Sequence, residues 1–364
     1  MSVGRRCVAI ALVVTACVVA GCSRQTADTQ GRQAVRVSSV SLVGAGASFP
    51  YPLYSKWFSE YAKANPGVKI SYQSIGSGGG IQQLKAGTVD FGASDAPLSD
   101  EEAKSMPGPV VHIPTVAGAV AVAYNLPGLK HPLKLDGSTL AAIYSGEVRR
   151  WNGQRVAALN PAEKLPDLAI TVVHRSDGSG TSYLFTSYLA AVSKDWSTKV
   201  GAGKSVNWPA GVGAKGNEGV TGVVKQTPGA IGYLELAYAK QNALPVAHLK
   251  NAAGEFVEPT VTSTTAAAAG GAETMKKDVR VSLVNSRAPG AYPIAGFTYL
   301  LVYQQQADQK KAEALARFLL WALKDGQQLA PPLLYAPLPE QVIQINESAV
   351  RGLTHQGKPV VSER

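Results

Sequence analysis

Three short stretches rich in glycine and hydroxyl side chains stand directly before segments with the hydrophobic spacing of a helix. They are Gly44–Pro50 (GAGASFP), Gly76–Gly80 (GSGGG) and Arg175–Thr181 (RSDGSGT). Glycine lets the backbone approach a ligand closely, and the N–H groups of a helix's first turn have no partner within the helix. The helix dipole adds about half a positive charge at the same end. These residue types in this order predict places where an anion binds.

Each stretch also has an ordinary structural explanation, because glycine and serine before a helix commonly form a turn and an N-cap. Three such stretches in one chain, with Arg175 at the start of the third, favour anion binding over that explanation. A nucleotide-binding P-loop is excluded, since no Gly-Lys-Ser or Gly-Lys-Thr directly follows any of the three.

A carboxylate stands at the end of a predicted strand, in the segment Asp90–Asp100 (DFGASDAPLSD). Asp95 before Ala-Pro could be a simple turn acid. At the carboxyl edge of a parallel sheet, however, it would face a ligand crevice. A carboxylate facing an anion is reasonable only if the anion carries a proton to donate. Hydrogen phosphate carries one at neutral pH, and sulfate does not.

The elements that must position these residues alternate along the chain from Val40 onward. Candidate strands are Lys69–Gln73, Val89–Ser94, Val110–Asn125, Ile170–His174, Ala230–Glu235 and Phe297–Tyr303. Candidate helices are Pro52–Ala64, Gly79–Ala86, Thr139–Ser145, Thr181–Ser193, Asn217–Gln226 and Ala307–Lys324. This alternation predicts an α/β fold with mostly parallel sheets flanked by helices.

Two very apolar runs, Val116–Asn125 and Ala295–Tyr303, are candidates for chain crossings between two lobes. A long extended segment that leaves one sheet and joins another is a natural hinge. The Ala/Gly/Thr-rich segment Thr260–Ala272 is either a surface loop or an Ala-rich helix, and no chemistry is assigned to it.

Composition excludes several protein classes. The 364 residues are 45% hydrophobic and 16% charged, with 37 Gly and 22 Pro, which excludes intrinsic disorder, a coiled coil and a collagen-like fibre. The net charge of +10 comes from dispersed basic residues with no run of five, so no nucleic-acid partner is predicted.

The N-terminal residues 1–21 have the pattern of an export signal. Arg5 and Arg6 precede an apolar stretch that is short for a membrane span, and the stretch ends in Val19–Cys22, which resembles a bacterial lipobox. The resemblance implies lipidation of Cys22 as the first mature residue; an uncleaved membrane anchor is the alternative. Residues 22–40 then form a tether. The body that follows is predicted to lie outside the cytoplasm, and it contains no cysteine.

The motifs together resemble one family along the chain from about Val40 to the C-terminal region. They are GAGASFPYP, SIGSGGG, VDFGASDAPLSDEE, HRSDGSGTSYLFTSYL, VNWPAG and PGAIGYLELAYAKQN. They are similar to the PstS family, the periplasmic phosphate-binding proteins of high-affinity phosphate ABC transporters.

This resemblance implies a two-lobed fold of class II type in which the chain crosses between lobes twice. Lobe I would comprise residues 41–122 plus 292–364, and lobe II residues 123–291. It further implies a monomer that binds inorganic phosphate entirely by hydrogen bonds. The expected partners are the permease and ATPase subunits of the importer, and no cofactor is expected.

The resemblance also assigns roles in the first lobe. Ser48, where the family usually has Thr, supplies a hydroxyl and a backbone N–H. Phe49 donates its backbone N–H while its ring closes the cleft. Ser77 donates from its hydroxyl and N–H, and Asp95 accepts the phosphate proton.

The second lobe receives its roles from the third stretch. Arg175 is expected to bind phosphate oxygens and to be oriented by Asp177. Ser179, Gly180 and Thr181 are expected to donate from the helix start through N–H groups and hydroxyls.

Three competing functions remain at this point. A serine hydrolase or phosphatase could use Ser179 or Ser77, but neither lies in a Gly-x-Ser-x-Gly elbow, and His174 beside this segment is more simply a strand residue. The protein could also bind another tetrahedral anion, such as sulfate, arsenate or a phosphonate. A site specific for sulfate should lack Asp95, whereas arsenate carries a proton comparable to that of phosphate and is expected to bind more weakly. A metal site is not expected, because the body has no thiol and no His-x-x-x-His spacing. No catalytic residue is therefore predicted.

Overall fold

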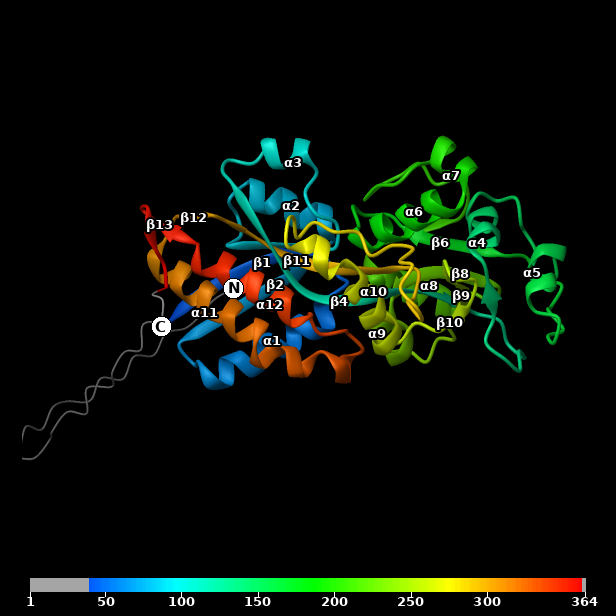
Figure 1. Ribbon diagram of the computed structural model, residues 1–364. Coiled ribbons are helices and arrows are strands. Elements are labelled where there is room, and N and C mark those ends of the chain that lie inside the picture. The colour runs from blue at the N-terminus through cyan, green and yellow to red at the C-terminus, as the bar shows by residue number, and fades with distance from the viewer. Residues whose placement is uncertain (1–38, 362–364) are drawn as a thin grey trace, which may run out of the picture. The chain divides into compact units, whose positions relative to one another are not determined.

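The computed structural model describes residues 39–361 (Figure 1). The predicted export signal, Cys22 and most of the tether lie outside the described residues. Within residues 39–361, no helix combines the length and the apolar character needed to cross a membrane.

A single eight-stranded mixed sheet runs through both lobes. Its strands are β1 (Val40–Gly46), β2 (Val68–Ser74), β3 (Phe91–Ser94), β4 (Val110–Tyr124), β6 (Thr171–Arg175), β7 (Val212–Ala214), β8 (Ala230–Glu235) and β11 (Ala295–Tyr303). The spatial order is β2-β1-β3-β11-β4-β8-β6-β7. The three strands at one end, β1 to β3, pair in parallel, and so do β8, β6 and β7 at the other end.

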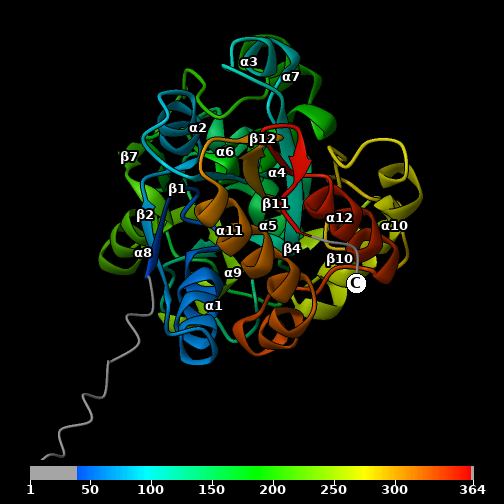
Figure 2. The same ribbon diagram turned by 90° about the vertical axis from the view of Figure 1, so that its left-hand side faces the viewer.

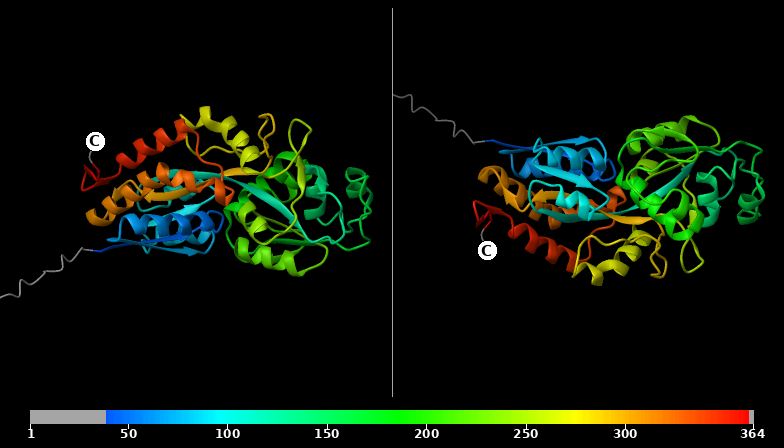
Figure 3. Two further views of the ribbon diagram at one scale, coloured as in Figure 1. Left: turned by 90° about the horizontal axis from the view of Figure 1, so that it is seen from below. Right: turned by 90° about the horizontal axis from the view of Figure 1, so that it is seen from above.

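The two antiparallel crossing strands, β4 and β11, join these parallel halves. Strand β4 has 15 residues. Its first part pairs with β11, from Tyr303↔Val110 to Ala295↔Ala119, and its last part, Val120–Tyr124, pairs with β8. The two apolar runs predicted as crossings therefore lie in β4 and β11, and they are the strands that both lobes share (Figures 1 and 3).

Helices cover the faces of the sheet in each lobe. The first lobe contains α1 (Tyr51–Ala64), α2 (Ser77–Lys85), α3 (Asp100–Lys104), α11 (Gln309–Leu323), α12 (Glu340–Arg351) and the 3-10 turns η1 (Asp325–Leu329) and η2 (Pro331–Leu333). The second contains α4 (Gly137–Tyr144), α5 (Gln154–Leu159), α6 (Gly180–Val192), α7 (Lys194–Lys199), α8 (Gly216–Gln226) and α9 (Leu236–Gln241). Figure 2 shows α11 beside α1 and α12 on the outer side of the first lobe.

The remaining elements are short or lie between the lobes. Helix α10 (Val261–Met275) packs on β4 and β11, so the helical alternative for Thr260–Ala272 is confirmed. Small three-stranded sheets are formed by β5 (Lys134–Leu135), β9 (His248–Lys250) and β10 (Phe256–Val257), and by β12 (Gln305–Gln306), β13 (Thr354–His355) and β14 (Lys358–Pro359).

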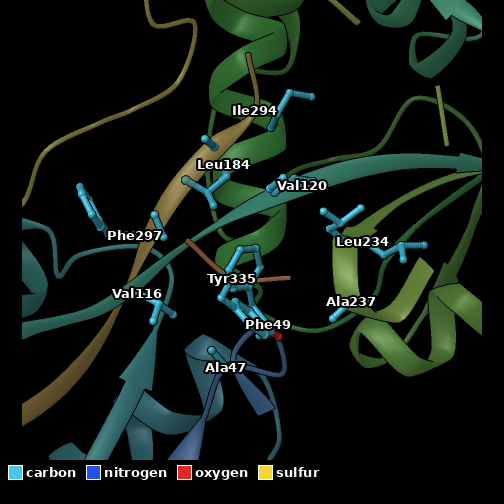
Figure 4. Close-up of a cluster of buried hydrophobic side chains, with 14 of the residues drawn as sticks. Ala47, Phe49, Val116, Val120, Leu184, Leu234, Ala237, Ile294, Phe297 and Tyr335 are labelled. Carbon is cyan, nitrogen blue, oxygen red and sulfur yellow. The ribbon is translucent and has the colours of Figure 1, made fainter. Parts of the chain in front are cut away.

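A buried apolar cluster lies beside the paired strands β4 and β11 (Figure 4). The ring of Phe49 packs there, edge to face against Tyr335 with centroids 6.3 Å apart. A Cβ on Gly118 of β4 would lie 2.5 Å from the Phe49 ring, so only glycine allows this strand to pass over it. The cluster therefore anchors the loop after β1 to the shared strands.

Connections from parallel strands to helices place the predicted site. The chain passes from β1 to α1, from β2 to α2, from β6 to α6 and from β7 to α8. Each of these helices begins at the carboxyl end of a parallel strand, which is where open α/β sheets bind ligands. The α/β two-lobed fold expected from the sequence is confirmed, with the added finding that the antiparallel crossing strands make the sheet mixed.

Candidate anion-binding site

The first lobe brings together side chains from the ends of its three parallel strands. Ser48 follows β1, Ser77 is the first residue of α2 after β2, and Asp95 directly follows β3. All three are buried, with exposed fractions of 1%, 0% and 2%. The parallel pairing of β1 with β2 and β3 aligns their carboxyl ends, which is why residues far apart in the sequence meet here.

The second lobe supplies a braced cation. Arg175 ends β6 and is 3% exposed. Its Nε and Nη2 donate to Oδ1 and Oδ2 of Asp177 at 2.7 and 2.5 Å, and Asp177 Oδ1 also accepts the N–H of Gly216 at 3.1 Å. Burial opposes ionisation of Asp177, but the hydrogen bonds and charge of Arg175 outweigh it and hold the pKa of Asp177 below its ordinary value. Asp177 thus holds the Arg175 guanidinium group in one orientation.

The start of α6 completes this half. Ser179 is the N-cap, and its hydroxyl accepts the N–H of Ser182 at 3.0 Å. Thr181 is fully buried, and its Oγ1 lies 3.4 Å from Nη1 of Arg175. Arginine and the first turn of α6 therefore face the same space.

One region of contact between the two halves consists of glycines and Ser77. Ser77 Oγ accepts the N–H of Gly180 at 3.0 Å and that of Asp95 at 3.3 Å. A Cβ on Gly180 would lie 2.6 Å from Asp95 Oδ2, and a Cβ on Gly76 (φ +85) would overlap Asp177 Oδ2. Glycine at these positions is what lets the lobes approach. In this structure the Gly180 N–H is directed at Ser77, so its predicted role as an anion donor stays a prediction.

Asp95 is a buried carboxyl with an unusual titration. Burial raises its pKa to about 7, although a hydrogen bond from Thr298 and the charge of Arg175 act in the opposite direction. Thr298 Oγ1 donates to Asp95 Oδ1 at 2.8 Å. Thr298 lies on β11 beside a register shift relative to β4, and irregularities of this kind re-aim side chains in a strand. Asp95 can therefore carry or accept a proton near neutral pH.

Several residues at the site were not predicted. Asn217 at the start of α8 contacts Ser48, and the Tyr238 hydroxyl donates to the Ser48 carbonyl at 2.7 Å. Thr298 had no recognisable signal in its strand. Asn217 had one, because it follows Gly216 at the start of a predicted helix, and glycine also stands near a helix start in the three stretches described above.

A buried acid also stands where the lobes meet. Glu235 ends β8 and is fully buried, and burial raises its pKa well above the ordinary value. Its Oε2 accepts the N–H of Ala237 at 2.8 Å and lies 3.1 Å from the Tyr335 hydroxyl, which donates to the Phe49 carbonyl at 2.7 Å. Its Oε1 has no hydrogen-bond partner within residues 39–361. A protonated Glu235 fits these contacts.

Other chemistry finds little support in the described part of the chain. The His174 ring stacks on Trp208 with centroids 4.8 Å apart, and within residues 39–361 no histidine hydrogen-bonds to Ser77 or Ser179. The same residues hold no group of three His, Cys, Asp or Glu side chains placed to bind a metal.

A mixed sheet shared by two lobes, with helix starts and a braced arginine between them, defines the class of two-lobed binding proteins. In agreement, residues 23–325 match the family described as the PBP superfamily domain.

Similar proteins identify the family within this class. The chain is 43% identical over 346 residues to a Xylella fastidiosa protein named phosphate-binding protein PstS, covering 93% of this chain and 94% of that protein. It is 45% identical over 312 residues to the Pasteurella multocida protein of the same name, covering 85% and 90%. A crystal structure of a phosphate-binding protein from Stenotrophomonas maltophilia shares the fold, with a TM-score of 0.64 and 21% identity over 85% of this chain and 94% of that one. The chain belongs to the PstS family of phosphate-binding proteins.

Proposed function

We propose that this protein binds inorganic phosphate between its lobes and delivers it to the permease and ATPase subunits of an ABC importer. It works outside the cytoplasm, as a monomer held at the membrane through lipidated Cys22, and it is not an enzyme. The family membership supports phosphate as the ligand. The lobes are taken as residues 41–122 plus 292–364 and residues 123–291.

The proposal is supported chiefly by a buried cation and a titratable carboxyl that face each other across the site. Arg175, fixed by Asp177, offers positive charge to an anion, while Asp95 on the facing lobe offers a carboxyl that titrates near neutral pH. Two groups of opposite preference suit a ligand that is anionic and still carries a proton. Hydrogen phosphate has both properties.

Hydrogen bonds from the nine predicted site residues would replace those that the phosphate makes to its hydration shell. Ser48, Ser77 and Thr181 supply hydroxyls, and the first turn of α6 supplies N–H groups beside the Arg175 guanidinium. Charge-assisted hydrogen bonds are about twice as strong as neutral ones, so the arginine dominates affinity. Phe49 contributes a backbone N–H, and Ser179 and Gly180 contribute the helix start.

Lobe closure follows from where these groups lie. A ligand that contacts Ser77 and Asp95 on one lobe and Arg175 on the other gains its full set of contacts only when the lobes are together. Binding therefore shifts an open–closed equilibrium toward the closed form, which the permease would recognise.

Selectivity against sulfate provides the test. In the wild-type protein, sulfate would place an oxygen without a proton against Asp95, and sites built around such a hydrogen bond reject the analogue lacking it by about 10⁴–10⁵-fold. In Asp95→Asn the amide can donate instead. We expect calorimetry at pH 7.5 to show sulfate binding at least about 100-fold tighter than in wild type, with phosphate binding retained.

The matched control is Asp90→Asn, at the opposite end of the same strand. The Asp90 carboxylate accepts a hydrogen bond from the Val43 N–H and forms an ion pair with Lys311. This variant should leave both anions unchanged. If sulfate binding stays undetectable in Asp95→Asn, Asp95 is not the discriminator. If the wild-type protein does not retain phosphate, the proposed function itself is wrong.

A phosphatase remains the second candidate from the sequence. Hydrolysis would need a base beside Ser77 or Ser179, and the Oγ contacts of both serines are with backbone N–H groups. Release of nitrophenol from a phosphate monoester, abolished by Ser179→Ala, would restore that candidate.

A further inference from the structure

Asn217 is a fully buried amide that connects both halves of the site. It lies in the first turn of α8, on the second lobe. Its backbone N–H and its Nδ2 donate to Ser48 Oγ at 3.1 and 2.9 Å, across the boundary between the lobes. Nδ2 also donates to Thr181 Oγ1 at 3.3 Å. One side chain thus contacts a predicted ligand-binding hydroxyl from each lobe.

The orientation of this amide is determined by a third contact. Asn217 Oδ1 accepts the backbone N–H of Glu235 at 2.9 Å. A backbone N–H can only donate, so the amide oxygen must point toward Glu235. The NH₂ group must then point toward the two hydroxyls, and a flipped amide would place two donors against each other.

The hydrogen bonds that the Ser48 and Thr181 hydroxyls accept determine where their protons can point. A hydroxyl oxygen has two acceptor positions and one proton. Ser48 Oγ accepts two N–H groups of Asn217, and Thr181 Oγ1 accepts one from Asn217 and one from Arg175 Nη1. With both acceptor positions used, each hydroxyl can act toward a further partner only as a donor. Ser77 Oγ accepts two backbone N–H groups, so it too can act toward a further partner only as a donor.

We propose that Asn217 is a positioning residue of the anion site, whose N–H groups occupy the acceptor sides of Ser48 and Thr181 and so turn both hydroxyl protons toward the bound oxyanion. The inference rests on the proposed function and deepens it. A site of hydroxyls that can only donate favours a ligand rich in acceptor oxygens. It leaves Asp95 as the acceptor for the single proton of such a ligand.

The test uses Asn217→Asp, which has nearly the same shape. Above its pKa, the introduced carboxylate cannot donate; it accepts the hydroxyl protons of Ser48 and Thr181 and adds a negative charge beside the anion. We expect the phosphate Kd, measured by calorimetry on the full exported chain at pH 8, to rise at least about 100-fold over wild type, because the two hydroxyl protons turn away from the anion and a negative charge is placed beside it.

The pH dependence separates positioning from mere structural support. Lowering the pH toward 5 protonates the introduced carboxylate, which restores a donor and removes the charge. The ratio of variant to wild-type Kd should therefore fall on acidification, and using the ratio cancels the protonation of phosphate itself. A ratio that is within threefold of one at pH 8, or that does not change with pH, overturns the proposal.

The matched control is Asn160→Asp, on the same lobe but outside the site. Asn160 is also buried, its Nδ2 donates to the carbonyls of Lys134 and Val156, and its Oδ1 accepts the Lys134 N–H. It should leave phosphate binding unchanged at every pH.

If Asn217→Asp does not fold, Asn217→Ala tests the same role without a charge, and we expect a loss of about tenfold from the missing donors. A Kd equal to that of wild type in this variant would contradict the inference. The wild-type titration in the same series reports the proposed function separately; its failure would remove the basis of both.

Discussion

The two halves of the site are built in opposite ways. The second-lobe half is charged and cross-braced, because Arg175 is held by Asp177, which is itself held by the Gly216 N–H. The first-lobe half carries two serine hydroxyls and the carboxyl of Asp95. The pKa of this carboxyl is about 7, so both its protonated and its ionised forms are present near neutral pH. The charged half can attract any anion, whereas Asp95 in the other half can form a hydrogen bond only with an anion that carries a proton.

This division has a physical reason. An arginine next to an ionised carboxylate keeps its charge in a buried site, whereas a carboxyl buried without a direct ion pair is pushed toward its neutral form. Separating the two carboxyls on opposite lobes lets Asp177 stay ionised while Asp95 titrates near neutral pH. Under the proposed function, affinity depends mainly on one lobe and selectivity on the other.

Removing the charge of the second-lobe half should have the largest effect. In Arg175→Met, the anion loses its cation and Asp177 is left without its partner. Leaving a buried anion without its cationic partner costs about 3–5 kcal/mol. We therefore expect phosphate affinity to fall by about 10³-fold in calorimetry.

Arg150→Met is the control for this variant, because Arg150 forms a similar pair with Asp167, Nε to Oδ1 at 2.6 Å, on the exposed surface. It should bind phosphate as wild type does. Binding by Arg175→Met within tenfold of wild type would show that the charged half does not dominate affinity.

A smaller effect is expected from the first-lobe half. Thr298→Val removes the hydrogen bond that lowers the pKa of Asp95, so this pKa rises above about 7. Fewer molecules then have the ionised Asp95 that accepts the ligand's proton. We expect phosphate affinity to fall about tenfold relative to wild type at pH 6.5, with most of the loss recovered at pH 8.5.

The sign of this pH dependence is the informative part. A raised pKa depletes the ionised form most strongly below the new pKa, and the deficit disappears above it. Thr264→Val, which removes a fully buried hydroxyl that donates to the Thr260 carbonyl in α10, is the control. A loss that is equal at both pH values would mean that Thr298 acts by packing alone.

The smallest effect belongs to the rim, where the lobes also touch. Lys204 on the second lobe pairs with Glu102 of α3 at 2.7 Å, with side chains 20% and 31% exposed. Partly exposed pairs contribute about 0–1 kcal/mol, so Lys204→Met should weaken phosphate binding by no more than about fivefold.

Salt should remove this difference, because surface ion pairs are screened. Titrations of wild type and Lys204→Met at 1 M salt are expected to coincide. Lys199→Met, whose exposed pair with Asp195 stays within the second lobe, is the matched control. If Lys204→Met lost as much phosphate affinity as Arg175→Met, the expectation that buried charges contribute more to binding than the rim ion pair would be wrong.

Much of the fold could be predicted from periodicity alone. The boundaries of β8 agree with the prediction, those of α1 and α8 differ by one residue at the N-terminal end, and those of α6 differ by one residue at each end. The strands of two or three residues and the helices of five or six residues were not predicted, because such segments contain too few positions to show a period. Strand β1 was also not predicted, although its carboxyl end carries the first glycine-rich stretch.

The sequence by itself determined which residue types follow which elements: small residues before helices, Arg175 and Asp177 two positions apart, and an acid after β3. These are local properties, since each depends on neighbours within a turn or a strand. It also determined the likeness to the PstS family through the same local motifs.

Only the tertiary structure decided which of these groups meet and what supports them. Thr298 reaches Asp95 across 203 positions of sequence, and Asn217 reaches Ser48 across 169. Such contacts depend on the register of β11 beside β4 and on the approach of the two lobes, and neither leaves a local pattern. Proton placement in the site follows from these long-range hydrogen bonds, because burial and partners, not residue type, set the state of a polar group.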